Sequence, residues 1–280
     1  MGKEKGQLKI FISVDMEGIW GLVSSSHVSH DSSEYNRTRR LMTQEANWAI
    51  EEAFNNGATE VVVNDSHSNM DNLLIEELDP RAQLISGGPK PLSMMEGIDD
   101  TFDGVIFVGY HTRAGTINGV FNHTYSGKSI ANVTINGKRM GECGINAGVA
   151  GYFGVPILAI SGDDLLAAQA KEEIGDLETI IVKKAISRYS AHNFSKETVR
   201  DLYRTRLAEA IRNRDKKPVL KYEGKISMDI EFNREVMAEC AMLLPEAVRI
   251  DEKTIRIESE DYIKIFMMFR AALNLGGSIS

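Results

Sequence analysis

The stretch LKIFISVDMEG, residues 8–18, places seven mostly apolar residues directly before an acidic turn. The apolar part predicts a buried strand at 8–14, and similar short runs further along the chain predict strands at 60–63, 105–110, 156–160 and 179–182. Segments with helical periodicity alternate with these strands, at 36–56, 72–78, 147–153 and 164–174. Such alternation is typical of an α/β fold with a mostly parallel sheet covered by helices on both faces.

The pattern changes toward the C-terminus, from about residue 195. Before that point, a hairpin with a tight Asn136-Gly137 turn is expected at 130–140. The later part predicts helices at 196–214, 234–243 and 261–273, and strand pairs at 219–232 and 248–257. We therefore expect two domains: an α/β domain at 1–190 that carries the candidate site, and a smaller α+β C-terminal part at 191–280 packed against it.

The composition excludes several classes of protein. The 280 residues include 40 acidic and 32 basic ones, with a net charge of −8, so the chain lacks the basic surface that binds nucleic acid or an anionic membrane. No run of 18 apolar residues predicts a transmembrane helix, and the run at 8–14 is too short for a signal peptide. Two cysteines, Cys143 and Cys240, make no disulfide framework and fit a reducing compartment. We expect a cytoplasmic protein.

Titratable residues follow four of the predicted strands. In chain order they are Asp15 and Glu17, Asp65 and His67, His111, and Asp163 and Asp164. Because the carboxyl ends of parallel strands meet at one edge of a sheet, we expect these side chains to converge there. Two carboxylates held together, such as Asp15 and Glu17, repel each other unless a proton or a cation lies between them. Carboxylates mixed with imidazoles suit zinc, with manganese, cobalt or iron as substitutes, whereas magnesium and calcium normally take oxygen ligands alone.

Most of these residues also have a structural explanation. A histidine at the end of a strand, such as His67 or His111, is more often a satisfied loop residue than a metal ligand. Asp163 or Asp164 fits the N-cap of the helix that follows. Asp65 either caps a helix near residue 72 or orients a ligand from behind. The convergence of three separate segments is the observation that favours a metal site.

Further candidates stand apart from the strand ends. Glu142 suits the first turn of the next helix, where a carboxylate favours the helix dipole, and His123 is either catalytic or structural. Cys143 is expected to be a core thiol rather than a nucleophile. The remaining histidines are expected to face solvent; they are His27, His30 and His192. The motifs of dinucleotide-binding proteins, serine hydrolases and zincins are absent from the sequence.

A series of short motifs runs along most of the chain. Ser13, Asp15, Glu17 and Gly18 form a Ser-x-Asp-x-Glu-Gly pattern near the N-terminus. Further segments follow at 63–67 (VNDSH), 109–111 (GYH), 122–123 (NH), 141–142 (GE), 150–152 (AGY) and 162–164 (GDD). In this order the motifs resemble the D-aminopeptidase family of bacterial dipeptide-transport operons, the DppA type. The resemblance starts at residue 8 and weakens after about residue 190.

The resemblance implies a site for two zinc ions per subunit. The ligands implied are Asp15, Glu17, His67, His111 and Glu142. Asp15 would bridge both ions, Glu17 and His111 would complete one of them, and the remaining two ligands would complete the other. His123 corresponds to the catalytic histidine of the family.

The same resemblance implies a metal-dependent aminopeptidase, a hydrolase that removes the N-terminal residue of short peptides and prefers a D-amino acid such as D-Ala. It also implies a homo-oligomer, a stacked decamer. The segment 262–273 is apolar almost all round, so it must be buried in the subunit or against a neighbour. Two alternatives stay open: a di-metal hydrolase of another bond, such as a phosphoester or another amide, and a non-catalytic metal- or peptide-binding protein.

Overall fold

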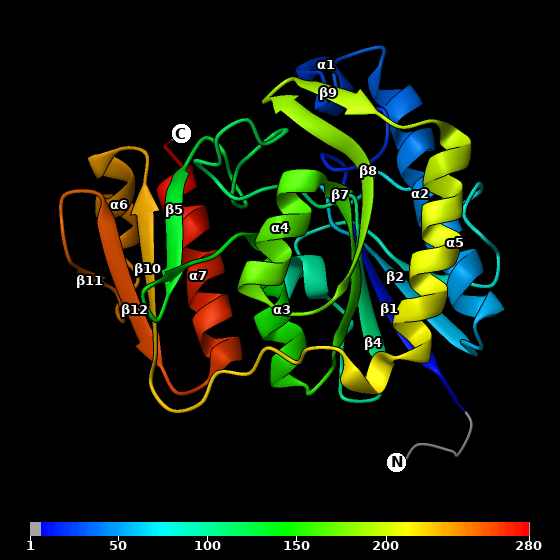
Figure 1. Cartoon of the computed structure of the whole chain (residues 1–280). Coiled ribbons are helices and arrows are strands. Elements are labelled where there is room, and N and C mark those ends of the chain that lie inside the picture. The colour runs from blue at the N-terminus through cyan, green and yellow to red at the C-terminus, as the bar shows by residue number, and fades with distance from the viewer. Residues whose placement is uncertain (1–6, 280) are drawn as a thin grey trace.

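The apolar run near the start of the chain forms β1, an inner strand of a seven-stranded sheet (Figure 1). The computed structural model describes residues 7–279. The sheet has the order β3-β2-β1-β4-β7-β8-β9, and its neighbouring strands are parallel except for β8 and β9. Its strands are β1 (Lys9–Val14), β2 (Glu60–Asp65), β3 (Gln83–Ile85), β4 (Gly104–Val108), β7 (Ile157–Asp163), β8 (Glu178–Ser187) and β9 (Ser190–Asn193).

Helices cover both faces of this sheet (Figure 1). One face carries α2 (Tyr35–Asn55) and α5 (Lys196–Arg212), and the other carries α3 (Glu142–Tyr152) and α4 (Asp164–Glu173). The side chains of β1 alternate between the two resulting cores, with Ile10 and Ile12 in one and Phe11 in the other. A strand buried on both sides needs apolar residues at every position, which explains the unbroken apolar run. The predicted α/β fold is confirmed.

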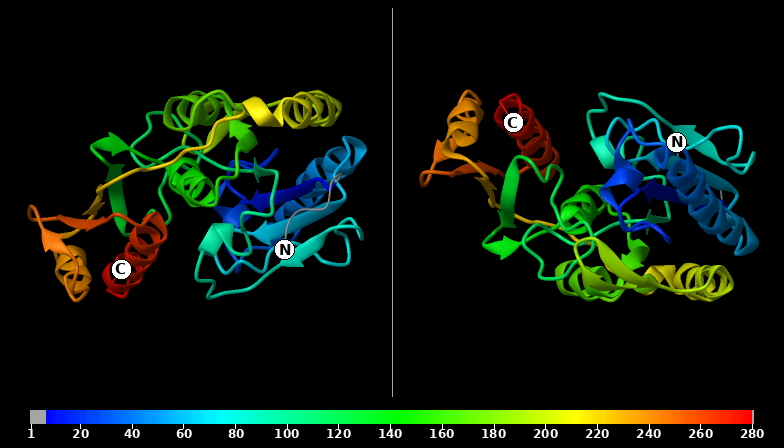
Figure 2. Two further views of the ribbon diagram at one scale, coloured as in Figure 1. Left: turned by 90° about the horizontal axis from the view of Figure 1, so that it is seen from below. Right: turned by 90° about the horizontal axis from the view of Figure 1, so that it is seen from above.

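A second, smaller sheet is antiparallel throughout and has the order β11-β12-β10-β5-β6. Its strands are β5 (Ile130–Ile135), β6 (Lys138–Arg139), β10 (Ile226–Phe232), β11 (Val248–Arg249) and β12 (Thr254–Ser259). The helices α6 (Glu235–Ala241) and α7 (Tyr262–Gly277) pack on it. α7 also contacts α3, which covers the parallel sheet, so α7 joins the two layers. The antiparallel sheet and α7 lie together on one side of the parallel sheet (Figure 2). The apolar segment 262–273 is thus buried largely within the subunit.

The division between the two sheets does not coincide with the boundary expected at residue 190. The hairpin β5–β6 belongs to the second sheet, because β5 pairs with β10 from the C-terminal part. In the other direction, α5 packs against α2 and β8 of the first sheet. The chain therefore crosses between the two layers more than once, and the two-domain division at 1–190 and 191–280 stays a prediction.

Two local predictions were wrong. Residues 72–78 form turns instead of a helix: the backbone N–H groups of Glu77 and Leu78 both donate to the carbonyl of Leu74, at 2.9 and 3.0 Å, so the segment closes a single turn before Pro80. The carboxylate of Asp65 accepts from the N–H groups of Asn72 and Leu73, each at 2.6 Å, at the start of that segment. The pair of strands expected at 219–232 is a single strand, β10, which finds its partners in β5 and β12 instead.

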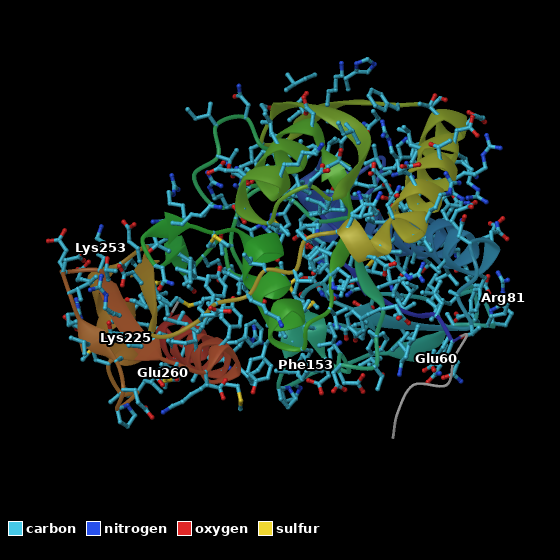
Figure 3. All side chains as sticks on the ribbon, turned by 60° about the horizontal axis from the view of Figure 1, so that its bottom comes forward. Glu60, Arg81, Phe153, Lys225, Lys253 and Glu260 are labelled. Atoms are coloured by element: carbon cyan, nitrogen blue, oxygen red, sulfur yellow. The ribbon has the colours of Figure 1, made fainter. Side chains whose placement is uncertain are left out.

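Charged side chains lie around the outside of both layers. Glu60 on β2 and Arg81 in the turn before β3 lie at the outside of the parallel layer, and Lys225 and Lys253, just before β10 and β12, lie at the outside of the antiparallel one (Figure 3). This distribution agrees with an acidic chain whose charges are mostly hydrated. Within residues 7–279, no helix combines the length and the hydropathy that crossing a membrane requires.

Candidate metal centre

The ends of β1 and β4 hold the first acidic turn in place. The backbone N–H of Asp15 donates to the carbonyl of Val108 at 2.8 Å, and the N–H of Gly18 donates to the carbonyl of Gly109 at 2.7 Å. A Cβ atom at position 18 would lie 1.8 Å from the carbonyl oxygen of Tyr110, so only glycine fits there. This close approach explains the glycine of the Ser-x-Asp-x-Glu-Gly motif and aims both carboxylates at the edge of the sheet.

Five buried side chains meet at this edge. They are Asp15, Glu17, His67, His111 and Glu142, and none is more than 7% exposed. The Nδ1 atom of His67 lies 2.8 Å from Glu17 Oε2 and 3.4 Å from Asp15 Oδ1. On the other side, the Nε2 atom of His111 lies 3.5 Å from Asp15 Oδ2 and 3.2 Å from Glu142 Oε1. The two oxygens of Asp15 therefore face two different histidines.

The electrostatics of the cluster are those of a cation site. Burial and the neighbouring Glu17 raise the pKa of Asp15 to about 8. Burial would lower the pKa of His111, but the carboxylates of Glu142 and Asp15 outweigh it and raise the pKa to about 10. Two buried polar atoms, Asp15 Oδ2 and His111 Nε2, have no hydrogen-bond partner among the described residues. Polar atoms buried in this way are rare unless they bind an ion, so the donor set fits zinc.

His123 lies beside this cluster without being part of its closest contacts. Its ring stacks on that of His111, with centroids 3.9 Å apart, and its Nε2 atom lies 3.7 Å from Glu142 Oε1 and 3.9 Å from Glu17 Oε1. The Nδ1 atom donates to the carbonyl of Phe121 at 2.6 Å, because a carbonyl can only accept. The unprotonated Nε2 of the neutral ring therefore faces the cluster. Burial and the adjacent His111 lower the pKa of His123, which keeps the ring neutral at pH 7.

Ligand atoms of two overlapping triads lie within 4.8 Å of one another. One triad is Asp15, Glu17 and His111, and the other is His111, His123 and Glu142. The first triad is the set of ligands that the resemblance implies for one of the two ions. The shortest contacts join Glu17 to His67 and His111 to Glu142, so each histidine also balances the charge of a carboxylate.

The other acidic candidates from the strand ends have structural roles. Asp65 clamps the loop that follows His67 through the backbone of residues 72 and 73. Asp163 is the N-cap of α4 and accepts from the N–H of Leu166 at 2.7 Å. Asp164 accepts from the N–H of Ala185 at 2.8 Å. These hydrogen bonds occupy the three carboxylates. Of the titratable residues expected to converge at the edge of the sheet, only Asp15, Glu17, His67 and His111 therefore belong to the cluster.

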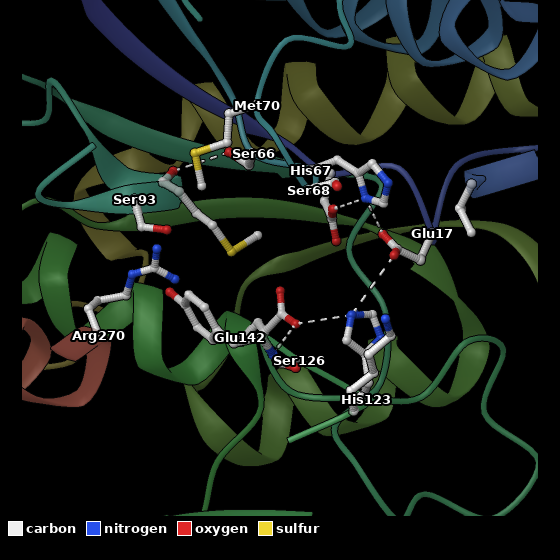
Figure 4. Close-up of a pocket in the computed structure, with 16 residues that line it drawn as sticks. Glu17, Ser66, His67, Ser68, Met70, Ser93, His123, Ser126, Glu142 and Arg270 are labelled. Carbon is white, nitrogen blue, oxygen red and sulfur yellow. Dashed lines mark hydrogen bonds and ion pairs between the residues drawn. The ribbon is translucent and has the colours of Figure 1, made fainter. Parts of the chain in front are cut away.

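A cavity of about 390 Å³ opens beside the cluster (Figure 4). Its metal-type lining residues are Asp15, Glu17, His67, His123 and Glu142. His111 lies behind them and does not reach the cavity surface. A pocket of this size takes a small molecule, and one with carboxylates and imidazoles on its wall can place a bond of that molecule next to a metal ion.

Lys183 on β8 has a role that sequence reasoning missed. This fully buried lysine donates to the carbonyls of Glu17, Ile19 and Leu22, each at 2.9 Å. Burial lowers its pKa to about 8, so the ammonium still carries at pH 7 the three N–H donors that match three carbonyls. Lys183 thereby fixes the shape of the loop that carries Glu17. The signal for it in the sequence is a lysine at a position that follows the apolar run Ile180–Val182 directly.

We expect Lys183→Met to weaken zinc binding about tenfold to a hundredfold, the usual effect of losing a group that orients a metal ligand. The three carbonyls would lose their donor, so the free energy of unfolding should fall by on the order of 3 kcal/mol. Zinc titration against a chelator and urea unfolding measure the two effects. Lys184→Met, at the exposed neighbouring position, is the matched control. Equal zinc affinity in both variants would contradict the role assigned to Lys183.

Comparisons with known proteins agree with this geometry. The model of the D-aminopeptidase family matches residues 8–271. A D-aminopeptidase from Bacillus subtilis (strain 168) is 43% identical over 260 residues, which make up 92% of this chain and 94% of that protein. The solved structure of the Zn-dependent D-aminopeptidase DppA from Bacillus subtilis, described as a self-compartmentalizing protease, has a TM-score of 0.93 at 41% identity and covers 96% of this chain and 98% of that one. The chain therefore belongs to the D-aminopeptidase family, as its motifs predicted.

Proposed function

We propose that this protein is a zinc-dependent aminopeptidase that removes an N-terminal D-amino acid, such as D-Ala, from short peptides. The observation that carries the proposal is the buried cluster of five ligand-type side chains beside His123, on the wall of a cavity. Membership of the D-aminopeptidase family supports the reaction, and the zinc dependence named for the Bacillus subtilis structure supports the metal.

The same cluster supports two ions bridged by Asp15. Its two carboxylate oxygens face opposite ways, toward His67 and toward His111. Ligand atoms of Asp15, Glu17 and His111 lie within 4.8 Å of one another, which supports the grouping implied by the sequence resemblance, with His67 and Glu142 beside Asp15 for the second ion. Manganese, cobalt or iron would suit the same ligand types.

Each residue at the site then has a defined task. Bound zinc supplies a Lewis acid that polarises the scissile carbonyl and lowers the pKa of water. His123 accepts the proton of the attacking water at Nε2 and returns it to the leaving amine, because its neutral ring presents that nitrogen to the cluster. The carbonyl of Phe121 holds the ring in this tautomer. The three buried carboxylates keep the site negative enough to retain two divalent ions.

We also propose that the protein works as a homo-oligomer in the cytoplasm, with a decamer as the expected form. The description of the Bacillus subtilis relative as self-compartmentalizing supports an assembly. Large apolar side chains that the subunit leaves exposed are available for it, among them Ile117, Leu243 and Met267. Light scattering should show a particle well above 31.0 kDa, and a monomer at micromolar concentration would refute the oligomer.

The zinc-loaded enzyme should release D-Ala from D-Ala-D-Ala and from D-Ala-Gly-Gly, and more slowly or not at all release L-Ala from the matched L-peptides. Removal of zinc with a chelator should abolish the reaction, and added zinc should restore it. Amine release and metal content by mass spectrometry measure the outcome. Hydrolysis of p-nitrophenyl phosphate without any peptide cleavage would instead favour a di-metal phosphoesterase. Stoichiometric metal and tight peptide binding without turnover would indicate a binding protein.

Substitutions should separate the metal ligands from the general base. Asp15→Ala should lose metal and activity together, because it removes the charge between the two ions. Glu142→Ala should retain at most about one equivalent of zinc. His123→Ala should keep both ions and lose roughly a hundredfold or more in kcat, the usual scale for a general acid or base. Zinc content and kcat distinguish these outcomes. A His123→Ala protein that has lost one zinc would make His123 a ligand instead.

A further inference from the structure

The wall of the cavity that faces the metal cluster carries an arginine without a charged partner. Arg270 on α7 is half-buried, lines the cavity, and points its guanidinium into it from the side opposite Glu17, His67 and His123 (Figure 4). The guanidinium carbon lies 5.4 Å from the centroid of the Tyr125 ring. Among residues 7–279, Arg270 makes no hydrogen bond or ion pair. Arginine is the side chain best suited to hold a carboxylate, through two parallel hydrogen bonds.

A buried hydroxyl lies on the same wall. The side chain of Ser93 is fully buried, is among the residues that line the cavity, and its Oγ has no hydrogen-bond partner in the described part of the chain; Figure 4 shows it on the same side of the cavity as Arg270. A buried hydroxyl without a hydrogen-bond partner lowers the stability of the fold unless a ligand accepts its hydrogen bond. A donor of this kind next to a guanidinium forms the two parts of a site for an anion.

The other cations near the cavity are less suited to this task. Lys90 already donates to Asn64 Oδ1 at 2.6 Å and to the carbonyl of Asp65 at 2.7 Å. Lys128 lines the cavity but is exposed, so water screens its charge. The carboxylates on the cavity wall, which are Asp15, Glu17 and Glu142, all belong to the metal cluster. The cavity therefore has a metal-binding end and a cationic end.

Both ends are connected by short, rigid links. The backbone N–H of Tyr125 donates to Glu142 Oε1 at 2.6 Å, and the ring of the same tyrosine supports Arg270. Asn64, three residues before His67, donates from its amide to the carbonyl of Ser93 at 3.0 Å. These links hold both ends of the cavity on one framework, while the long side chain of Arg270 can adjust its reach to a peptide of two or three residues.

We infer that Arg270 and Ser93 bind the free C-terminal carboxylate of the substrate, which makes the enzyme selective for di- and tripeptides over longer or C-terminally blocked ones. The inference rests on the proposed function and specifies its substrate class. A short peptide at neutral pH carries an amine at one end and a carboxylate at the other, and the cavity carries groups that complement each end. A cavity of about 390 Å³ has the size of a pocket for a small molecule, which suits a peptide of two or three residues.

The test compares two substrates that differ in one charge: D-Ala-D-Ala and the same dipeptide with a C-terminal amide. For the unmodified enzyme, kcat/KM should be about tenfold to a hundredfold higher for the free acid, mostly through KM, because a charge-assisted contact is lost in the amide. Arg270→Gln should lower kcat/KM for the acid by the same factor and leave the amide within about twofold, so the preference disappears. Ser93→Ala should reduce the preference several-fold.

Matched variants identify the group responsible. Lys264→Gln removes an exposed charge from the same helix, α7, and should keep the full preference. Loss of the preference in Lys128→Gln and not in Arg270→Gln would overturn the assignment. Arg270→Lys, which keeps the charge without the planar fork, should fall between the native enzyme and Arg270→Gln.

The remaining outcomes are equally decisive. An unmodified enzyme that cleaves acid and amide equally would overturn this inference while leaving the aminopeptidase function intact, and this comparison needs no variant to fold. An equal loss on both substrates in Arg270→Gln would mean that Arg270 only supports Tyr125, and would also overturn it. Failure to release D-Ala from either substrate would overturn the proposed function and the inference together.

Discussion

Three carboxylates buried at one point are the constraint on which the rest of this structure depends. Asp15, Glu17 and Glu142 are each at most 7% exposed and share one small region. Left without cations, such a group of charges is strongly unfavourable, because burial removes the water that would separate them. Burial and Glu17 raise the pKa of Asp15, whereas His67 lowers the pKa of Glu17 and His111 lowers that of Glu142. Divalent ions would balance the same charges, which is the physical reason for proposing metal at this point.

The surrounding scaffold holds this unfavourable arrangement together. Gly18 lets the acidic turn approach the end of β4 at a distance that no other residue permits. Lys183 gathers three carbonyls of the loop that follows, and the N–H of Tyr125 fixes Glu142. Each anchor comes from a different part of the chain. Ligands held in this way cannot move apart to relieve their repulsion. The site is therefore already arranged for an ion before the ion binds, and such pre-organisation increases the affinity.

The sequence predicted the fold and part of the site, for a physical reason. Asp15, His67 and His111 follow parallel strands, and parallel strands deliver their ends to one edge, so their convergence could be foreseen. Glu142 and His123 come from a helix start and a loop outside that rule, and only the family resemblance pointed to them. Lys183 could not be foreseen, because its partners lie more than 160 residues away in the chain. The segment 72–78 was mispredicted because its apolar pattern is short and closes only one turn, at Leu74, before Asp79-Pro80.

The cavity has carboxylates at one end and a guanidinium at the other, and this arrangement would select substrates by length without any contribution from oligomer assembly. A self-compartmentalizing enzyme, as the Bacillus subtilis relative is described, excludes large substrates at the entrance of a chamber. A guanidinium held opposite the metal cluster acts within one subunit instead. In the proposed enzyme, a longer peptide whose first bond lies at the zinc site would carry neutral backbone past Arg270, so it would remove water from the half-buried guanidinium without pairing it, which costs binding free energy. Selection for short peptides would then arise from electrostatics inside each active site, whatever the number of subunits around it.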